Sequence, residues 1–314
     1  ALGVVGGGQL GRMFVHAAQA MGYRVVVLDP DPTCPAGQAA DELIVAPYDD
    51  ATALETMAER CAAVTTEFEN VPAGALARIA QRRPVAPSAA AVAVCQHRAR
   101  EKAHFVASGV PCVAHARLEA PADLQAVSPA LFPALLKTST LGYDGKGQVA
   151  VEHPGDLDRA WARLGRVPCL LEQRVDLWRE ISVIVARNAQ GQWVSLPVQQ
   201  NLHRDGILAV TQVPAPDVTA ASQAQAARIL HRLAATLDSI DACDLSQFEL
   251  QVRTMAGLPL ASPRLQAAAV MLNLLGDLWP AGDSHAQPPW EVALALPGVH
   301  LHLYGKSQPR PGRK

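Results

Sequence analysis

The chain has 314 residues, enough for about two domains, and its 49% apolar and 18% charged content excludes a disordered or fibrous protein. Its 27 basic and 29 acidic side chains leave a formal net charge of −2, so no strongly basic surface for nucleic acid is expected. No apolar run reaches the roughly 18 residues of a membrane span, and the six dispersed cysteines form no C-x-x-C pair. The composition therefore predicts a cytoplasmic globular protein without a nucleic-acid or membrane partner.

Strands and helices alternate over the first 90 residues. Short buried strands are expected at residues 2–5, 23–28, 43–46 and 62–66. Helices are expected from an apolar stripe between Leu10 and Met21, at residues 50–61 behind a cap at Asp49 or Asp50, and at residues 72–81. This alternation predicts a Rossmann-like α/β domain over residues 1–90, with a parallel sheet covered on both faces.

From residue 88 onward the pattern is typical of an antiparallel-rich α+β module. Helices are expected at residues 88–95, 98–108, 156–164, 219–237 and 244–255. Strands are expected at residues 134–138, 148–152, 169–175, 181–186, 193–199 and 299–304, with a further apolar run at residues 267–275. We therefore assign a second domain to residues 91–258 and a small C-terminal domain to residues 259–314.

The glycine-rich turn at residues 6–11 matches G-x-G-x-x-G between a strand and a helix. Glycines there permit a tight turn whose backbone N–H groups approach an anion at the helix N-terminus. Asp29 ends the next strand, near the place of a ribose-binding acid. On this motif alone, a dinucleotide site and a tight turn that serves another ligand both stay open.

A second glycine-rich segment follows the strand that carries Lys137. Gly142, Gly145 and Gly147 fall within six positions, and Lys146 stands between the last two. Glycine-rich loops wrap phosphates through their N–H groups, and a lysine on a rigid strand holds a phosphate as a point charge. Because the chain has only five lysines, two of them around this loop favour a nucleotide phosphate site over an incidental hairpin.

Two carboxylates lie downstream of that loop. Glu172 stands near the end of a predicted strand, and Glu180 follows eight residues later. A carboxylate at a strand end can accept hydrogen bonds from the hydroxyl groups of a ribose. An exposed salt-bridging glutamate is the alternative, and the neighbouring phosphate loop is what favours the nucleotide interpretation.

Six segments in chain order resemble the N5-carboxyaminoimidazole ribonucleotide synthase family, the ATP-grasp carboxylating enzymes of microbial purine biosynthesis. They are VVGGGQLGRM at residues 4–13, TEFENVP at 66–72, residues 137–148, NLHRDGIL at 201–208, NLLGD at 273–277 and HLYGK at 302–306. The resemblance covers nearly the whole chain. It implies an ATP-grasp fold with a Rossmann-like N-terminal domain and a small C-terminal domain, and it disfavours a dehydrogenase.

The resemblance also implies a nucleotide site. It places Arg98, Lys137 and the loop Gly142, Tyr143, Asp144, Gly145, Lys146, Gly147 and Gln148 around the ATP phosphates, Glu172, Gln173, Arg174 and Val175 at the adenine hinge, Glu180 on the ribose and His203 near the nucleotide. Tyr143, Asp144 and Lys146 are implied to act at the reacting groups, where Tyr143 and Asp144 reach the substrate amine.

A ribonucleotide site is implied beside the first glycine-rich turn. Gly8, Gln9 and Leu10 face the ribonucleotide in such enzymes, and Lys306 and Arg313 match a pair that holds its phosphate. Either Glu67 or Glu69 helps to hold the aminoimidazole. The implied reactants are ATP, bicarbonate and 5-aminoimidazole ribonucleotide, with Mg²⁺ as cofactor and a homodimer as the assembly. A formate-using relative and a non-catalytic nucleotide-binding protein remain as alternatives.

The chain departs from the family between Asp238 and Ser239. There the family has a strand bearing a glutamate, an Asn-Glu pair and an Arg-Pro-His-Asn-Ser segment, and those acids bind Mg²⁺, which prefers carboxylate oxygens. Either the natural protein contains several dozen more residues at this point, or it has a true deletion. Because deletion of central buried strands would expose core and sheet edges, we favour the former. The Mg²⁺ ligands stay unknown from this sequence.

Overall fold

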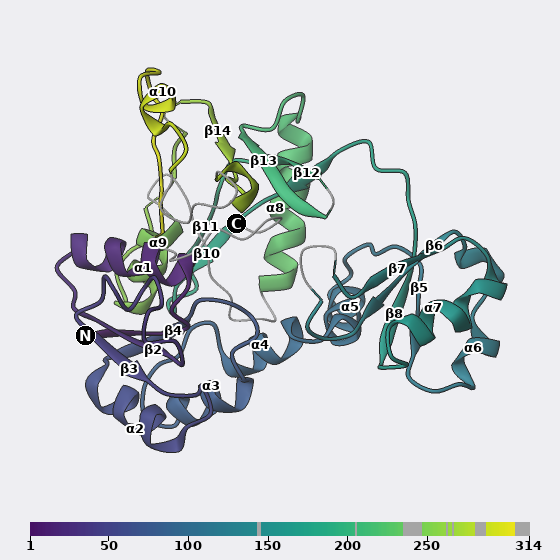
Figure 1. The fold of residues 1–314 in the computed structure, drawn as a ribbon, viewed down its shortest axis with the longest axis horizontal. Helices are drawn as coiled ribbons and strands as arrows, with labels where there is room; N and C mark the ends of the chain where they lie inside the picture. Colours follow the sequence, from purple (N-terminus) through teal and green to yellow (C-terminus); the bar gives the residue numbers. More distant parts are fainter. Residues whose placement is uncertain are drawn as a thin grey trace.

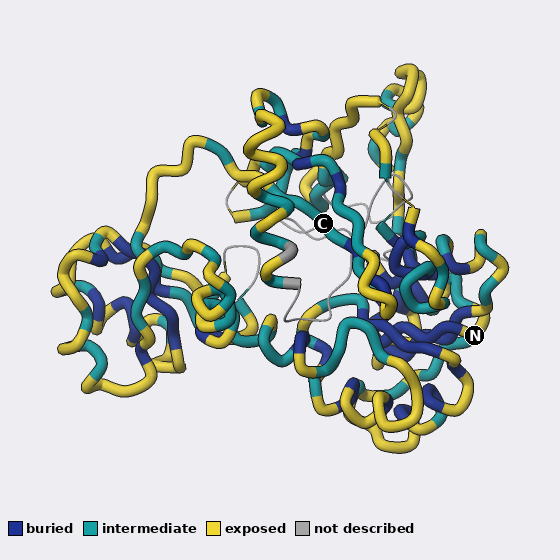
Figure 2. Tube along the Cα trace, turned by 180° about the vertical axis from the view of Figure 1, so that it is seen from behind, coloured by how far each residue is buried: buried dark blue, intermediate teal, exposed yellow. Residues whose placement is uncertain are grey.

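The computed structural model describes residues 1–142, 146–204, 206–234, 247–261, 263–265, 267–279 and 287–304. Figure 1 shows three sheet-centred parts, of which the one built on β5–β8 stands apart from the others. In Figure 2 the buried residues gather in the first two sheets, whereas the third sheet is mostly half-buried or exposed.

The first sheet is parallel, as predicted, and has the order β3-β2-β1-β4. Its strands are β1 (Leu2–Val5), β2 (Val25–Asp29), β3 (Glu42–Val45) and β4 (Ala63–Thr66), and β1, β2 and β4 are buried throughout. The helices α2 (Ala51–Arg60), which Asp50 caps, and α3 (Ala73–Ala80) cover one face. Burial of both faces explains the Val-rich, non-alternating strands.

The other face of this sheet is covered by two helices from distant parts of the chain. These are α1 (Gln9–Ala20) and α9 (Gln247–Met255), which share one core cluster. Phe248 and Val252 of α9 are buried against the sheet, and the Gln251 side chain donates to Thr65 Oγ1 at 2.8 Å. The start of the helix expected at residues 244–255 lies outside the described residues, as does the end of the one expected at 219–237.

The second sheet is antiparallel and has the order β5-β8-β6-β7. Its strands are β5 (His115–Leu118), β6 (Ala134–Thr138), β7 (Gln148–Val151) and β8 (Cys169–Gln173). The helices α4 (Ala89–Cys95) and α5 (Arg98–Ala107) lead into it, and α6 (Asp123–Ala126) and α7 (Leu157–Arg163) accompany it. Trp161 of α7 is fully buried in its core.

The third sheet has the order β14-β13-β12-β9 and lies beside a separate β10–β11 hairpin. The bounds are β9 (Glu180–Ser182), β10 (Val185–Arg187), β11 (Trp193–Ser195), β12 (Gln199–Arg204), β13 (Ile207–Val213) and β14 (Ala269–Leu272), with α8 (Ala220–Ala234) and α10 (Trp290–Leu294) nearby. The single strands predicted at 181–186 and 193–199 are wrong, since each is split in two. Pro197 explains the second split, because proline donates no N–H to a ladder.

The strand predicted at residues 299–304 is also wrong, because these residues have no regular secondary structure. Among the described residues, no strand pairs with this segment. In the described part of the chain, none of the helices has the length and apolar character needed to cross a bilayer.

Candidate functional site

A largely buried ion cluster joins α5 to the second sheet. Lys137 on β6 and Glu172 on β8 are diagonal neighbours on one face of that sheet. Nζ of Lys137 donates to Oε2 of Glu172 at 2.5 Å, and Nζ of Lys102 on α5 lies 2.8 Å from Oε1. The side chains of Lys102, Lys137 and Glu172 are 18%, 21% and 11% exposed. One carboxylate therefore bridges two lysines away from bulk water.

The charge state of Glu172 depends on both lysines. Burial would raise the pKa of its carboxyl group, but the hydrogen bonds from Lys102 and Lys137 and their charges outweigh it and lower the pKa below the ordinary 4.5. A carboxyl group whose pKa is depressed by folding stabilises the fold above its unfolded pKa. That stabilisation is lost as the pH falls through the folded value.

We therefore expect the Glu172 ion pairs to stabilise the protein above pH 4.5 and to lose this effect on acidification. The measurement is urea unfolding of the wild type and Glu172→Gln between about pH 7 and pH 3. The difference in unfolding free energy between them should shrink below pH 4.5. Glu119→Gln, at an exposed position after β5, is the control, and a Glu172→Gln difference that stays constant with pH would contradict this expectation.

Arg98 links the ion cluster to the glycine-rich loop. Its Nε donates to the Thr138 carbonyl at 3.1 Å and its Nη2 to the Gly142 carbonyl at 2.9 Å. Glu101, three positions further on α5, is partly buried, and burial raises the pKa of its carboxyl group against the opposing charges of Arg98 and Lys102. Three cations and two carboxylates therefore meet at the base of this loop, with a formal surplus of one positive charge.

The two ends of the loop close on Thr138. Thr138 N donates to the Gly147 carbonyl at 2.8 Å, and a Cβ on Gly147 would lie 2.7 Å from Thr138 Oγ1. Gly147 also has φ +69°, which favours glycine. Lys146 is exposed here, and Gln148 begins β7. Tyr143, Asp144 and Gly145 lie outside the described residues.

The predicted adenine hinge follows the end of β8. Gln173 is the last residue of that strand, and the next two residues are exposed. The Arg174 guanidinium forms a two-point ion pair with Glu152 at 2.6 and 3.1 Å. The Val175 side chain is 45% exposed. The Arg174 and Glu172 side chains are thus engaged within the protein, and the N–H groups of Gln173 and Arg174 donate to the Ala114 and Pro133 carbonyls.

Glu180 and His203 meet on the third sheet. They lie on the paired strands β9 and β12, and His203 Nδ1 is 3.1 Å from Glu180 Oε2. The sequence prediction assigned both to the nucleotide, and the structure brings them together. They stand on a different sheet from Lys137 and Glu172.

The first glycine-rich turn is filled by the protein's own carboxylate. Gly8 N and Leu10 N donate to the two oxygens of Glu67, the latter at 3.1 Å. A Cβ on Gly8 would overlap the Glu67 carboxylate, which explains the need for glycine. Burial raises the pKa of the Glu67 carboxyl group against these hydrogen bonds. The positive end of α1 therefore already faces a negative charge, near the partly buried Gln9.

Asp29 is also engaged within the protein. It accepts hydrogen bonds from Gly7 N at 2.6 Å, from the Tyr48 hydroxyl at 2.7 Å and from Asp31 N at 2.8 Å. Both carboxylate oxygens are therefore used to hold the turn. A role of Asp29 as a ribose acceptor, the dinucleotide interpretation of this motif, has no support in this geometry.

The positions of Glu67 and Glu69 bear on which of the two helps to hold the aminoimidazole. Glu67 lies in the turn, whereas Glu69 is exposed and accepts a hydrogen bond from Asn70 at 3.1 Å. Arg12 Nη1 donates to the Tyr304 carbonyl at 3.3 Å and so ties the C-terminal segment to the same end of α1. The predicted phosphate ligands Lys306 and Arg313 lie outside the described residues.

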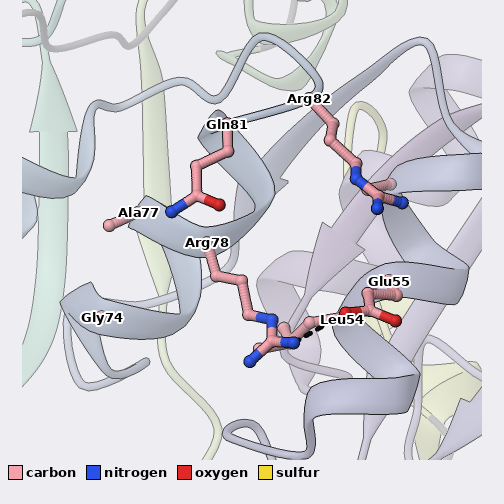
Figure 3. Close-up of a pocket in the computed structure, with 8 residues that line it drawn as sticks. Leu54, Glu55, Gly74, Ala77, Arg78, Gln81 and Arg82 are labelled. Carbon is pink, nitrogen blue, oxygen red and sulfur yellow. Dashed lines mark hydrogen bonds and ion pairs between the residues drawn. The ribbon is translucent and has the colours of Figure 1, made fainter.

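Two hollows lie in the N-terminal part. A groove of about 400 Å³ lies between α2 and α3, where Arg78 binds Glu55 at 2.7 Å (Figure 3). None of the predicted site residues lines it. A hollow of about 40 Å³ is lined by Leu10, Glu67 and Gln247 among others. The smaller hollow, not the larger groove, coincides with the predicted ribonucleotide site.

A magnesium site is not assembled by the described residues, among which no three His, Cys, Asp or Glu side chains gather as metal ligands. Glu172, the buried carboxylate nearest the glycine-rich loop, is committed to two lysines. The donor set in the described part of the chain therefore does not fit Mg²⁺.

Sequence reasoning missed Lys102 and Glu101. Lys102 follows Arg98 by four residues on a helix, so the two side chains share a face, and this spacing was the available signal. What it could not reveal is that α5 packs this face against β8.

Comparison with known proteins gives matches over the three parts of the chain. Family models match residues 1–96 as a ribonucleotide synthetase preATP-grasp domain, residues 103–252 as an ATP-grasp domain and residues 269–314 as a phosphoribosylaminoimidazole carboxylase C-terminal domain. The N5-carboxyaminoimidazole ribonucleotide synthase of Brucella melitensis is 36% identical, over all of this chain and 94% of its own length.

Solved structures agree with these matches. The synthetase of the same name from Thermus thermophilus has a TM-score of 0.89 at 34% identity, over all of this chain and 91% of its own. The N5-carboxyaminoimidazole synthase of Aspergillus clavatus, in complex with ADP and 5-aminoimidazole ribonucleotide, has a TM-score of 0.88 at 27% identity with the same coverage.

The alignment with the Brucella protein runs over 347 positions, whereas this chain has 314 residues. At least 33 aligned positions therefore have no counterpart in this chain. Similarity nonetheless extends over its whole length, in sequence and in fold. On these grounds, the chain belongs to the N5-carboxyaminoimidazole ribonucleotide synthase family of ATP-grasp ligases.

Proposed function

We propose that this protein carboxylates the amine of 5-aminoimidazole ribonucleotide with bicarbonate at the expense of ATP, giving N5-carboxyaminoimidazole ribonucleotide, ADP and phosphate. The observation that carries the proposal is the cationic cluster of Arg98, Lys102 and Lys137 at the base of the glycine-rich loop. Similarity to a synthase solved with ADP and the ribonucleotide supports the choice of substrates.

The nucleotide site we propose includes residues of the second and third sheets. Lys137, Arg98 and the loop from Gly142 to Gln148 hold the ATP phosphates, because two cations lie at the base of a glycine-rich segment, the kind of loop that binds phosphates. The backbone from Glu172 to Val175 contacts adenine. Glu180 and His203 approach the ribose and the rest of the nucleotide from the third sheet.

The ribonucleotide site we propose lies at the N-terminus of α1. The turn at Gly8, Gln9 and Leu10, with Glu67 held inside it, forms one wall. We assign the phosphate to Lys306 and Arg313, and the support for this is that Tyr304, two residues before Lys306, accepts a hydrogen bond from Arg12 on α1. Tyr143, Asp144 and Lys146 act where the amine meets the carboxyl donor.

Bicarbonate is a poor electrophile, so ATP first converts it to carboxyphosphate, which then delivers its carbon to the exocyclic amine. Phosphoryl transfer asks mainly for positioning and for charge that stabilises the spreading anion. Lysines and the glycine-rich loop, which we propose acts as a lid, provide both. Closure of the lid also excludes water, which would hydrolyse carboxyphosphate. Mg²⁺ belongs to this chemistry in our proposal, although the described residues provide no ligand set for it.

We further propose a cytoplasmic homodimer without nucleic-acid or membrane partners. The balanced charge of −2 supports the absence of nucleic acid.

The function is tested by ADP release from the protein with all reactants present. We expect turnover to require both 5-aminoimidazole ribonucleotide and bicarbonate, because carboxyphosphate is useful only when the amine can capture its carbon. Equal ADP release without the ribonucleotide would contradict the proposal. Turnover with formate in place of bicarbonate would indicate a transformylase. Nucleotide binding without any turnover would indicate a non-catalytic protein, which the lack of the acidic block between Asp238 and Ser239 makes the second candidate.

A further inference from the structure

Glu172 forms ion pairs with two lysines, Lys137 and Lys102. The sequence predicted a role in phosphate binding for Lys137 only. Lys137 takes Oε2 and Lys102 takes Oε1, so each oxygen has its own cation. Lys102 comes from α5, whereas Lys137 comes from β6, so the two amino groups are fixed by different elements. The two lysine side chains are similarly buried, with 18% and 21% of their surface exposed.

Recruitment of Lys137 to a phosphate weakens its hold on Glu172. A buried carboxylate without a cation is costly, because desolvation is no longer offset by a nearby opposite charge. With Lys102 in place, Glu172 keeps one full ion pair when the Lys137 amino group turns toward an anion. Without Lys102, the same movement would leave the carboxylate with no cation of its own, because Arg98 is bound to carbonyl oxygens of the loop.

We propose that Lys102 is a positioning residue that retains Glu172 and so frees Lys137 to bind nucleotide phosphate. This inference rests on the ATP site of the proposed function. Lys102 acts through Glu172 and does not itself contact the nucleotide. Glu101, partly buried and next to Lys102 on α5, places a second carboxyl group near this cation.

Two other roles of Lys102 make different predictions. As a direct phosphate ligand, Lys102 would matter whether or not Glu172 carried a charge. As a purely structural residue, it would affect the binding of any nucleoside and the thermal stability equally. As a positioning residue, it matters only for ligands that engage Lys137 and only while Glu172 is charged.

The test is titration calorimetry of ADP and adenosine with the wild type, Lys102→Met, Lys102→Arg, Glu172→Gln and the Lys102→Met/Glu172→Gln double variant. Lys102→Met should weaken ADP binding about tenfold or more and leave adenosine binding unchanged. Lys102→Arg should keep ADP binding within about threefold of wild type, because arginine restores the charge. The double variant should bind ADP as tightly as Glu172→Gln alone.

Arg100→Met is the matched control, since it removes one positive charge from an exposed position of the same helix. It should leave ADP and adenosine binding unchanged. Thermal unfolding of each variant identifies any loss of folding, and Lys102→Arg together with Glu172→Gln keeps the test informative if Lys102→Met fails to fold.

Three outcomes would overturn the inference. Unchanged ADP binding by Lys102→Met would remove the role, and so would equal losses for ADP and adenosine. A further loss of ADP affinity in the double variant relative to Glu172→Gln would make Lys102 a direct ligand. A wild-type protein that binds no ADP would instead overturn the ATP site of the proposed function. If the wild type and Lys102→Met bind ADP equally well, only the role of Lys102 is overturned.

Discussion

Lys137→Ala should abolish ATP turnover and leave the fold intact. We expect ADP release at saturating substrates to fall by about 10³ or more, because the variant removes a preorganised cation from the site where phosphate charge develops. The fold should survive because Glu172 keeps its ion pair with Lys102 at 2.8 Å, so no buried carboxylate is left without a cation. The measurement is ADP release, with thermal unfolding as the check on folding.

Arg159→Ala is the control for this experiment. Arg159 lies on α7 of the same sheet domain and forms an exposed ion pair with Asp156, with 78% of its side chain accessible. Such surface pairs contribute little, so both turnover and stability should stay close to wild type. If Lys137→Ala retained turnover within about threefold of this control, Lys137 would have no part in phosphate binding.

The parts of the fold that followed from sequence are those whose signal is local. Uninterrupted Val-rich runs such as β1 and β2 predict strands buried on both faces, and the parallel sheet is observed as expected. The third sheet was less predictable. Each of the segments 181–186 and 193–199 has a continuous apolar pattern, yet its two halves belong to different sheets. The pattern does not reveal this, because pairing partners lie in distant strands. The segment at 299–304 alternates like a strand yet has no partner in the described part of the chain.

In the candidate site, too, the residues with a local sequence signal were predictable and those that depend on packing were not. Lys137 and the glycine-rich loop were recognisable because their residue types and spacing carry the chemistry. Lys102 was not, because its importance arises only when α5 packs against β8 and brings its amino group to Glu172. The choice between Glu67 and Glu69 likewise needed the structure. Only one of these alternating side chains reaches the N–H groups of Gly8 and Leu10.

The natural protein should contain a further segment between Asp238 and Ser239, and turnover should depend on it. Relatives align over 347 positions against the 314 residues of this chain, which leaves 33 positions without a counterpart. The segment that the family resemblance expects there carries the acids that bind Mg²⁺. Because the chain lacks that acidic block, a polypeptide of only these 314 residues should bind ADP and turn over ATP at least about 10³-fold more slowly than the natural protein.

Intact mass and turnover test this together. The natural protein should exceed the 33.2 kDa of the present chain, and its turnover should require Mg²⁺. An insertion of equal length made only of glycine and serine is the matched control, because it restores the spacing without restoring carboxylates. That control should remain inactive while it still binds ADP. A natural protein of about 33.2 kDa with full Mg²⁺-dependent turnover would contradict the prediction and would require Mg²⁺ ligands from elsewhere in this chain.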